Sequence, residues 1–171
     1  MKFAGEKHRD QTVPGANANY LLHISNVAME VLLAHAVDKS FNLDNAIQMA
    51  ILHDILEDTA TSYEELSITF GNDIAIGVQA LTKDKSLPSK QDMILDTLSR
   101  INDQPKEVGL VKLADRITNL QAPPAHWNKD KATSYREEAI LIAQHLAGKN
   151  EFLHNRLVQK ISEYQKYLDL L

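Results

Sequence analysis

Four side chains that can bind metals or carry protons fall within six consecutive residues, His53-Asp54-Ile55-Leu56-Glu57-Asp58. At about 100° per residue of an α-helix, His53 and Glu57 project in similar directions, and Asp54 and Asp58 follow on the adjacent strip. All four fall within an arc of roughly 140°, and apolar side chains occupy the opposite side. Burying unpaired carboxylates is costly, so a packed helix of this composition needs a cation to balance them. The segment therefore predicts metal chemistry.

Further ligands must come from distant parts of the chain, because adjacent residues cannot hold an ion without help. His23 and Asp115 each interrupt an apolar helical stretch, at Tyr20–Ile24 and Leu110–Arg116. Two imidazoles and two carboxylates form a mixed nitrogen and oxygen site, which suits Mn²⁺, Fe²⁺ or another first-row ion. Such an ion lowers the pKa of water and turns it into a nucleophile.

Each of these residues also has a purely structural explanation. A lone buried histidine such as His23 is more often a hydrogen-bonded core residue than a ligand. Asp115 could pair with Lys112 or Arg116 on its own helix. Carboxylates at the end of a helix could be solvated, although they oppose the helix dipole there. The combination of His23, the His-Asp pair and a later aspartate in one helical chain favours the metal site.

Composition limits the classes of function. The chain has 171 residues, of which 44% are hydrophobic and 24% charged, as in a globular domain with a full core. A net charge of −5 without a polybasic block argues against binding to nucleic acid, and no apolar run is long enough to span a membrane. Cysteine is absent, which excludes disulfides and thiolate metal sites. The N-terminal residues lack the pattern of a secretory signal. We expect a cytoplasmic protein with a small-molecule substrate, and a homo-oligomer stays open.

The hydrophobic periodicity is helical almost throughout, and no segment alternates with period two. We therefore predict an all-α fold, a single helical bundle over residues 1–171. Helices are expected near 19–37, 42–58, 61–70, 73–81, 89–101, from 105 past 120, 133–146 and 151–168. Pro123-Pro124 should end the sixth of these. The segments 12–19 and 83–89 are rich in Gly, Pro, Asn or Asp, and as loops they could line a site.

These residues resemble the signatures of the HD-domain metal phosphohydrolases, in particular the RelA/SpoT-type alarmone hydrolases and their small single-domain forms. The similarity extends across nearly the whole chain. The matching segments are Phe3–Gln11, Tyr20-Leu21-Leu22-His23, Ala50–Thr59 around His-Asp-Ile-Leu-Glu-Asp-Thr, Leu81–Pro88 and Val111–Leu120. Trp127 and Tyr135 also fit the aromatic spacing of the small hydrolases.

The resemblance implies a reaction and a set of residues that carry it. Mn²⁺ would be held by two histidines and two aspartates, His23, His53, Asp54 and Asp115. Glu57 and Asp58 would assist the attacking water, and Asn119 would contact the nucleotide. The reaction would release pyrophosphate from the 3′ position of a guanosine 3′,5′-bis(diphosphate)-like alarmone.

Four further residues are candidates for substrate binding. Lys7 and Lys85 could neutralise phosphate charge, although solvated surface lysines are the common alternative. Trp127 could stack on or shield the base, and Tyr135 belongs to the same aromatic pair. An ordinary core role for Trp127 is the alternative.

One segment departs from the family pattern. Relatives usually carry Gln-x-Arg-x-x-Gly-x-Pro-Tyr before the first metal histidine, whereas Val13 stands at the arginine position here and the Gly-x-Pro-Tyr spacing is lost. The base preference could therefore differ. Alternative substrates are an adenine alarmone, an NADPH-like phosphorylated dinucleotide or a nucleoside monophosphate. A non-catalytic nucleotide-sensing module is the alternative from another class, but sensing would not need Glu57 and Asp58.

Overall fold

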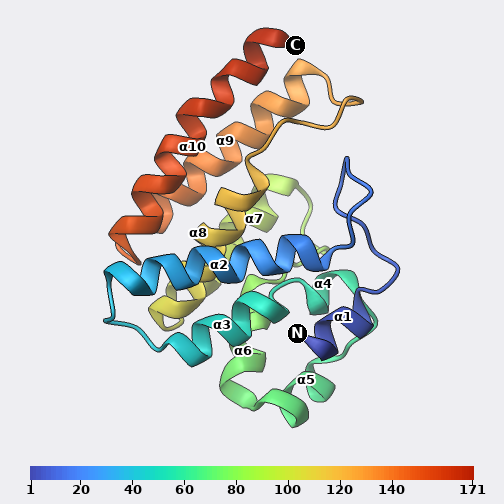
Figure 1. The fold of residues 1–171 in the computed structure, drawn as a ribbon, viewed down its shortest axis with the longest axis vertical. Coiled ribbons are helices and arrows are strands. Elements are labelled where there is room, and N and C mark those ends of the chain that lie inside the picture. Colours follow the sequence, from blue (N-terminus) through green and yellow to red (C-terminus); the bar gives the residue numbers. More distant parts are fainter.

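The regular structure consists of ten α-helices, and a computed structural model describes all residues 1–171 (Figure 1). The helices are α1 (Lys2–Lys7), α2 (Leu21–Val37), α3 (Leu43–Leu52), α4 (Ile55–Asp58), α5 (Tyr63–Phe70), α6 (Asn72–Leu81), α7 (Lys90–Asn102), α8 (Lys106–Asn119), α9 (Lys129–His145) and α10 (Glu151–Leu170). The only β pairing is an isolated antiparallel bridge between Thr12 and Asn19. The all-α prediction is confirmed. None of the helices combines the length and the apolar composition needed to cross a membrane.

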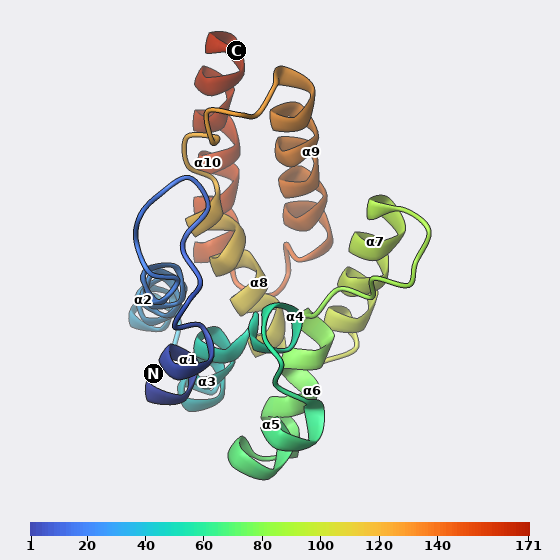
Figure 2. The ribbon, with the colours of Figure 1, turned by 90° about the vertical axis from the view of Figure 1, so that its right-hand side faces the viewer.

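Helix α8 lies at the centre of the fold, in contact with α2, α3, α6, α7, α9 and α10. Figure 2 shows it between α2 and α3 on one side and α7 on the other, with α9 and α10 packed against its C-terminal half. Every residue from Val108 to Ile117 is buried. Because three of these are the charged residues Lys112, Asp115 and Arg116, α8 must supply partners for them inside the protein.

Most helix boundaries follow from local capping. The side chain of Asn42 accepts a hydrogen bond from the amide of Asn45, and Ser89 does the same for Asp92 at the start of α7. At the end of α5, Gly71 adopts a φ of 92°, which favours glycine. These three signals are legible in the sequence, and they place the ends of α3, α5 and α7 where the residue types indicate.

Other boundaries differ from the predictions. Ser62 rather than Thr61 caps α5, because the hydroxyl of the buried Thr61 instead accepts a hydrogen bond from Thr59. Helix α9 begins at Lys129, four residues before the expected start, because Asn128 caps it through the amide of Lys131. Helix α8 ends at Asn119, ahead of the two prolines that were expected to stop it.

The expected helix over 42–58 is interrupted at His53-Asp54. Helix α3 ends at Leu52, and α4 starts at Ile55 after Asp54 adopts φ −100° and ψ 2°. On a regular helix the side chains of adjacent residues diverge by about 100°. The break instead lets an Asp54 carboxylate oxygen approach His53 Nε2 to 2.9 Å. The local loss of helix is thus what brings these two side chains together.

We predict that the free energy of unfolding depends strongly on the buried face of α8. Leu110→Ala should lower it by about 2–5 kcal/mol, because the fully buried side chain leaves a cavity in the core. Leu170→Ala, at a leucine that is 83% exposed, is the matched control and should change it by less than about 0.5 kcal/mol. Urea denaturation followed by circular dichroism measures both. Equal effects at the two positions would contradict the central role of α8.

Candidate metal centre

Four side chains from three parts of the chain converge beneath the surface. His23 comes from α2, His53 and Asp54 from the turn between α3 and α4, and Asp115 from α8. The Nε2 atoms of the two histidines lie 3.2 Å apart, and Asp115 Oδ1 lies 3.4 Å from His23 Nε2 and 3.8 Å from His53 Nε2. Asp54 Oδ2 lies 3.8 Å from His23 Nε2. The sequence prediction that these four residues meet is therefore consistent with the structure.

The hydrogen bonds on the far side of each imidazole define which nitrogen carries the proton. His53 Nδ1 donates to the carbonyl oxygen of Ala50 at 2.8 Å. His23 Nδ1 faces the Thr118 hydroxyl at 3.4 Å, and because that hydroxyl donates to the Asp115 carbonyl oxygen it can only accept from the imidazole. When both rings are neutral, their Nε2 atoms therefore direct lone pairs toward one point.

This donor set fits a divalent ion. Two facing lone pairs and two carboxylates repel one another unless a cation lies among them. A separation near 3 Å is that of neighbouring ligands on one ion with bonds of about 2.1 Å. The nearest donor atoms of His23, His53 and Asp54 all lie within 4.8 Å of one another, and the two imidazoles are buried. Nitrogen and oxygen ligands without thiolate suit a first-row metal.

Asp115 is held by neighbours on its own helix. Its Oδ2 accepts from the Lys112 ammonium at 3.0 Å and its Oδ1 from the Asn119 amide at 2.5 Å. Burial by itself would raise the pKa of Asp115, but the Lys112 ammonium and the imidazoles of His23 and His53 hold that pKa well below the ordinary value. The carboxylate therefore stays ionised. The ion pair with Lys112, considered as a structural alternative to ligation, coexists with the approach to the imidazoles.

Asp54 has a partner that the sequence pattern did not assign. The Tyr20 hydroxyl donates a hydrogen bond to Asp54 Oδ2, the oxygen that also faces His53. Burial raises the pKa of Tyr20 and the charge of Asp54 raises it further, so the phenol stays protonated and acts as a donor. Tyr20 lies three residues before His23, within a segment whose similarity to the family was already visible.

Glu57 of α4 faces the loop after α6. Its carboxylate lies 3.6 Å from Lys83 Nζ and accepts from the Lys83 amide at 3.3 Å, and the Lys85 ammonium donates to the Glu57 carbonyl oxygen. Arg100 of α7 fixes this loop by donating to the carbonyl oxygens of Gln79, Ala80 and Thr82. Lys83 and Arg100 were not predicted as site residues. The position of Lys83 within Leu81–Pro88, one of the segments that resemble the family signatures, was the available signal.

Asp58 is exposed and is reached from the N-terminal segment. Gln11 Nε2 donates to Asp58 Oδ2 at 2.8 Å, while its Oε1 accepts from His8 Nδ1 at 2.7 Å. The carbonyl oxygen of Gln11 also accepts from the Tyr20 amide. Gln11 and Tyr20 therefore form the two stems of one hairpin, and each stem contacts one aspartate of the motif.

The predicted substrate-binding residues occupy three different places. Lys7 pairs with Glu65 of α5 at 2.7 Å. Asn119 is exposed at the C-terminal end of α8, with its amide directed at Asp115. Trp127 and Tyr135 form an edge-to-face pair with ring centroids 5.1 Å apart. Lys85 and Asn119 thus contact the candidate site residues Glu57 and Asp115, Lys7 is engaged at α5, and the aromatic pair belongs to α9 and the loop before it.

A buried cation links the aromatic pair to α8. The Arg116 guanidinium lies 4.5 Å from the centroid of the Tyr135 ring and pairs with Glu138. Burial raises the pKa of Tyr135 to about 12, although Arg116 opposes the rise. Arg116 follows Asp115 directly, so the packing of α9 is coupled to the orientation of the helix that carries this candidate ligand.

Val13 has a structural role at the position where relatives carry arginine. Its half-buried side chain packs against the small apolar cluster of Ala4, Tyr20 and Ile24. Gly15, two residues later, has a φ of 79° and lies against Pro124 of the loop after α8. The hairpin thus closes against that loop through apolar contacts, without a cation at position 13.

Comparison with known proteins places this centre in a family. A family model described as HD domain matches residues 1–152. The chain belongs to the HD domain family. In this HD domain, α2, the α3–α4 turn and α8 supply the histidine, the His-Asp pair and the final aspartate.

Individual relatives of the HD domain cover almost the whole chain. It is 34% identical over 170 residues to guanosine-3′,5′-bis(diphosphate) 3′-pyrophosphohydrolase MESH1 of Danio rerio, covering 95% of this chain and 91% of the relative. The Homo sapiens protein of the same name is 31% identical over 160 residues, covering 91% and 87%. A solved structure described as a metazoan ortholog of SpoT that hydrolyses ppGpp superposes with a TM-score of 0.79 at 27% identity, covering 95% and 91%. The similarity therefore includes both sequence and fold.

We predict that metal binding releases a proton from His53. Burial lowers the pKa of His53, but the carboxylates of Asp54 and Asp115 outweigh it and raise that pKa to about 9. Below pH 9 the metal-free imidazole is protonated and has no lone pair to offer, so metal affinity should rise with pH. Between pH 7 and 8.5 the affinity for Mn²⁺ should increase about tenfold per pH unit. Calorimetry in buffers of different ionisation enthalpy measures the released proton, and a pH-independent affinity without release would contradict this assignment.

We also predict that Tyr20 supports the ligand Asp54. Tyr20→Phe removes one hydroxyl and should weaken Mn²⁺ binding by about 10–100-fold, as expected for loss of a hydrogen bond to a ligating carboxylate. Tyr63→Phe is the matched control, because the Tyr63 hydroxyl bonds to Asn72 in another part of the fold. Identical affinities for the two variants, determined by calorimetric titration, would remove the supporting role of Tyr20.

Proposed function

We propose that this chain is a metal-dependent hydrolase that releases pyrophosphate from the 3′ position of guanosine 3′,5′-bis(diphosphate)-like alarmones. The observation that carries the proposal is the convergence of two imidazole lone pairs and two buried carboxylates in an HD domain. Relatives that span most of the chain are named for this activity, which supports the choice of reaction. We further propose that residues 1–171 act as one domain, since α10 packs on both α8 and α9.

His23, His53, Asp54 and Asp115 would hold the metal, and we propose Mn²⁺ as the ion. Its donor set of two nitrogens and two carboxylates supports a first-row metal over Mg²⁺ or Ca²⁺, which prefer oxygen ligands throughout. When bound, a divalent ion supplies Lewis acidity, which polarises a phosphoryl oxygen and lowers the pKa of water.

Glu57 is proposed to accept the proton of the attacking water. Its side chain is 16% exposed, so it can reach a water at the edge of the centre while remaining shielded from bulk solvent. The amide and the ammonium of Lys83 restrain the Glu57 carboxylate. Because the carboxylate is already held in place, little conformational entropy is lost when it acts on the water. Asp58, held by Gln11, would orient the same water through a hydrogen bond.

Substrate binding is proposed to use the residues that surround this edge. Lys85 lies close to Glu57 and could neutralise the departing pyrophosphate, and Lys7 could do so if it exchanges Glu65 for a phosphate. Asn119 would contact the nucleotide beside Asp115. Trp127 and Tyr135 would border the base. Because Val13 supplies no cation, an adenine alarmone or an NADPH-like phosphorylated dinucleotide is the second candidate substrate.

We predict that hydrolysis requires both a metal ligand and the proposed base. With Mn²⁺ present, Asp54→Ala should abolish pyrophosphate release, and Glu57→Gln should lower kcat by about 10²–10⁴-fold, the usual contribution of general-base catalysis. Glu64→Gln, at an exposed glutamate in the first turn of α5, is the matched control and should retain full activity. Chromatography of a nucleotide panel that includes guanine and adenine alarmones, NADPH and nucleoside monophosphates measures the products.

The products separate the competing functions. Pyrophosphate from a 3′-diphosphate supports the proposal, whereas orthophosphate alone would indicate a nucleotide phosphatase. Tight binding of the nucleotides by the Mn²⁺-loaded protein without turnover would indicate a sensing module. Equal rates for the wild type, Asp54→Ala and Glu57→Gln would remove the assigned chemistry altogether.

A further inference from the structure

Helix α2 carries an exposed apolar surface in addition to its buried one. Leu22, Met29, Leu32, Leu33 and Val37 are 50%, 58%, 49%, 49% and 67% exposed, and they make up five of the eleven large hydrophobic residues that the protein exposes. At about 100° per residue they share an arc of roughly 140° on the outer side of the helix. These five residues are called the α2 strip below.

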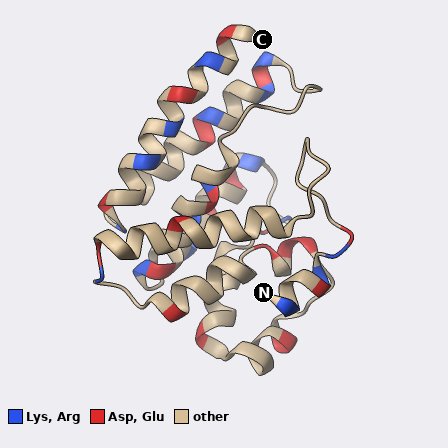
Figure 3. Cartoon of the chain, in the orientation of Figure 1, with Lys and Arg blue, Asp and Glu red and all other residues tan.

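The opposite side of α2 is already packed in the core. Val27, Val31 and Ala34 are fully buried there, so the helix is apolar on both faces. Glu30 is the only Asp, Glu, Lys or Arg residue between Leu21 and Val37, and Figure 3 shows α2 almost free of charge along its length. The half-buried Ser25 and Asn26 share the exposed arc but are uncharged, and a surface with so many exposed apolar side chains is normally covered by a partner. The exposed side of α2 therefore lacks a cover.

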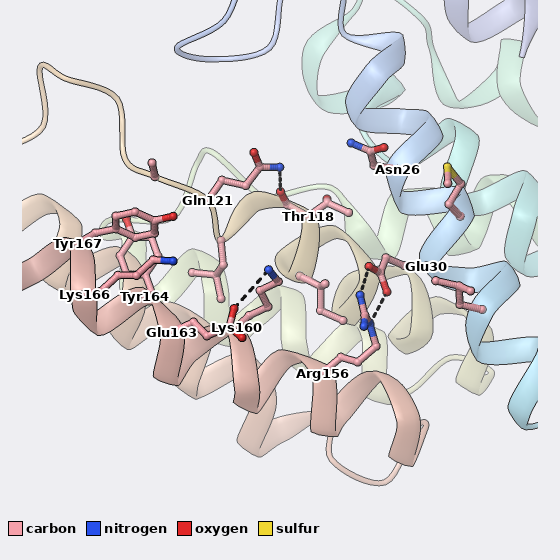
Figure 4. Close-up of a pocket in the computed structure, with 15 residues that line it drawn as sticks. Asn26, Glu30, Thr118, Gln121, Arg156, Lys160, Glu163, Tyr164, Lys166 and Tyr167 are labelled. Atoms are coloured by element: carbon pink, nitrogen blue, oxygen red, sulfur yellow. Dashed lines mark hydrogen bonds and ion pairs between the residues drawn. The ribbon is translucent and has the colours of Figure 1, made fainter.

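A groove runs beside the α2 strip, between α2 and α10. It has a volume of about 530 Å³, and Met29 and Leu33 form part of its wall (Figure 4). The Arg156 guanidinium is already paired with both carboxylate oxygens of Glu30 at 2.6 and 2.7 Å. Farther along α10, Lys160 pairs with Glu163 at 3.5 Å, and the Lys166 ammonium lies over the Tyr167 ring. Each of these cations has a partner within the protein, and the wall of the groove combines apolar with polar side chains.

We propose that two copies of this chain associate through the α2 strip, as an antiparallel pair of α2 helices related by a twofold axis. An uncharged strip is complementary to an uncharged strip, and the same surface on a second copy meets that requirement. The midpoint between Leu22 and Val37 places the axis near Met29, so that Leu22 of one copy lies opposite Val37 of the other. Apolar side chains of the strip would enter the groove of the facing copy.

The dimensions suit a stable dimer. The strip extends about 22 Å along the helix, from Leu22 to Val37. Its five apolar side chains can serve as the core of an interface that buries about 800 Å² per chain, as a stable dimer requires. A lipid surface is a weaker occupant, because interfacial helices flank their apolar face with Lys and Arg, which α2 lacks, and the protein has a net charge of −5.

Analytical ultracentrifugation of the intact protein tests the association. The wild type should sediment with the mass of two chains at tens of micromolar. Met29→Glu and Leu33→Glu should raise the dimer dissociation constant at least 100-fold, because each places two carboxylates in an apolar interface near the axis. Ile68→Glu, at an 87% exposed isoleucine of α5, is the matched control and should remain dimeric. Circular dichroism confirms that each variant is folded. A wild type that is monomeric throughout this range would overturn the proposal.

Cysteine cross-linking tests the arrangement independently of the glutamate variants. The chain contains no cysteine, so a single introduced thiol reports one contact. Under mild oxidation Met29→Cys should form a disulfide-linked dimer with itself, whereas Leu22→Cys should cross-link efficiently only when mixed with Val37→Cys. Ile68→Cys should form no cross-link, as judged on a non-reducing denaturing gel. Cross-linking that is equal at all positions would overturn the proposed pairing, as would a monomeric protein that binds phosphatidylglycerol vesicles through the strip.

Discussion

The Nε2 atoms of His23 and His53 face each other across 3.2 Å, and two lone pairs at this distance repel each other unless a cation lies between them. Neither ring can turn away, because the Ala50 carbonyl and the Thr118 hydroxyl hold the opposite nitrogens. Without metal, a proton on His53 removes this repulsion. A bound divalent ion would remove it in the same way. The surrounding carboxylates favour a cation at this point in both cases. Three separate helical segments are therefore joined by the need for positive charge between them.

Helix α8 shows how the protein accommodates so much charge in its interior. Lys112 neutralises Asp115, and Arg116 is neutralised by Glu138 and covered by the Tyr135 ring. Each buried charge has its own partner, which is the condition under which burial of ions can be tolerated. One face of the helix consequently presents the candidate ligand Asp115 to the centre, and another anchors α9 and α10. The C-terminal helices contribute to the site through this packing.

The fold and the four metal-binding candidates could be inferred from the sequence because their signals are local. Helical periodicity, the caps at Asn42 and Ser89 and the glycine at position 71 each depend on a few neighbouring residues. His23 and Asp115 were recognisable as polar residues in apolar stretches. The break at His53-Asp54 could not be inferred, since it arises from contacts with α2 and α8 that outweigh local helix propensity. Gln11, Tyr20 and Lys83 were missed as site residues because their partners lie 26 to 47 positions away in the chain.

The hairpin between Gln11 and Tyr20 holds Asp58 and Asp54 from its base and not from its tip. Its base is clamped by the Tyr20 amide bond to Gln11 and by the bridge between Thr12 and Asn19, and from this base the two side chains reach their aspartates. Val13 packs against Tyr20 at this base, whereas residues 14–17 at the tip contribute to neither clamp by their side chains. The tip can therefore change in length and composition during evolution while the geometry of the acids is preserved. Changes at the tip therefore leave the hydrogen bonds to Asp54 and Asp58 in place.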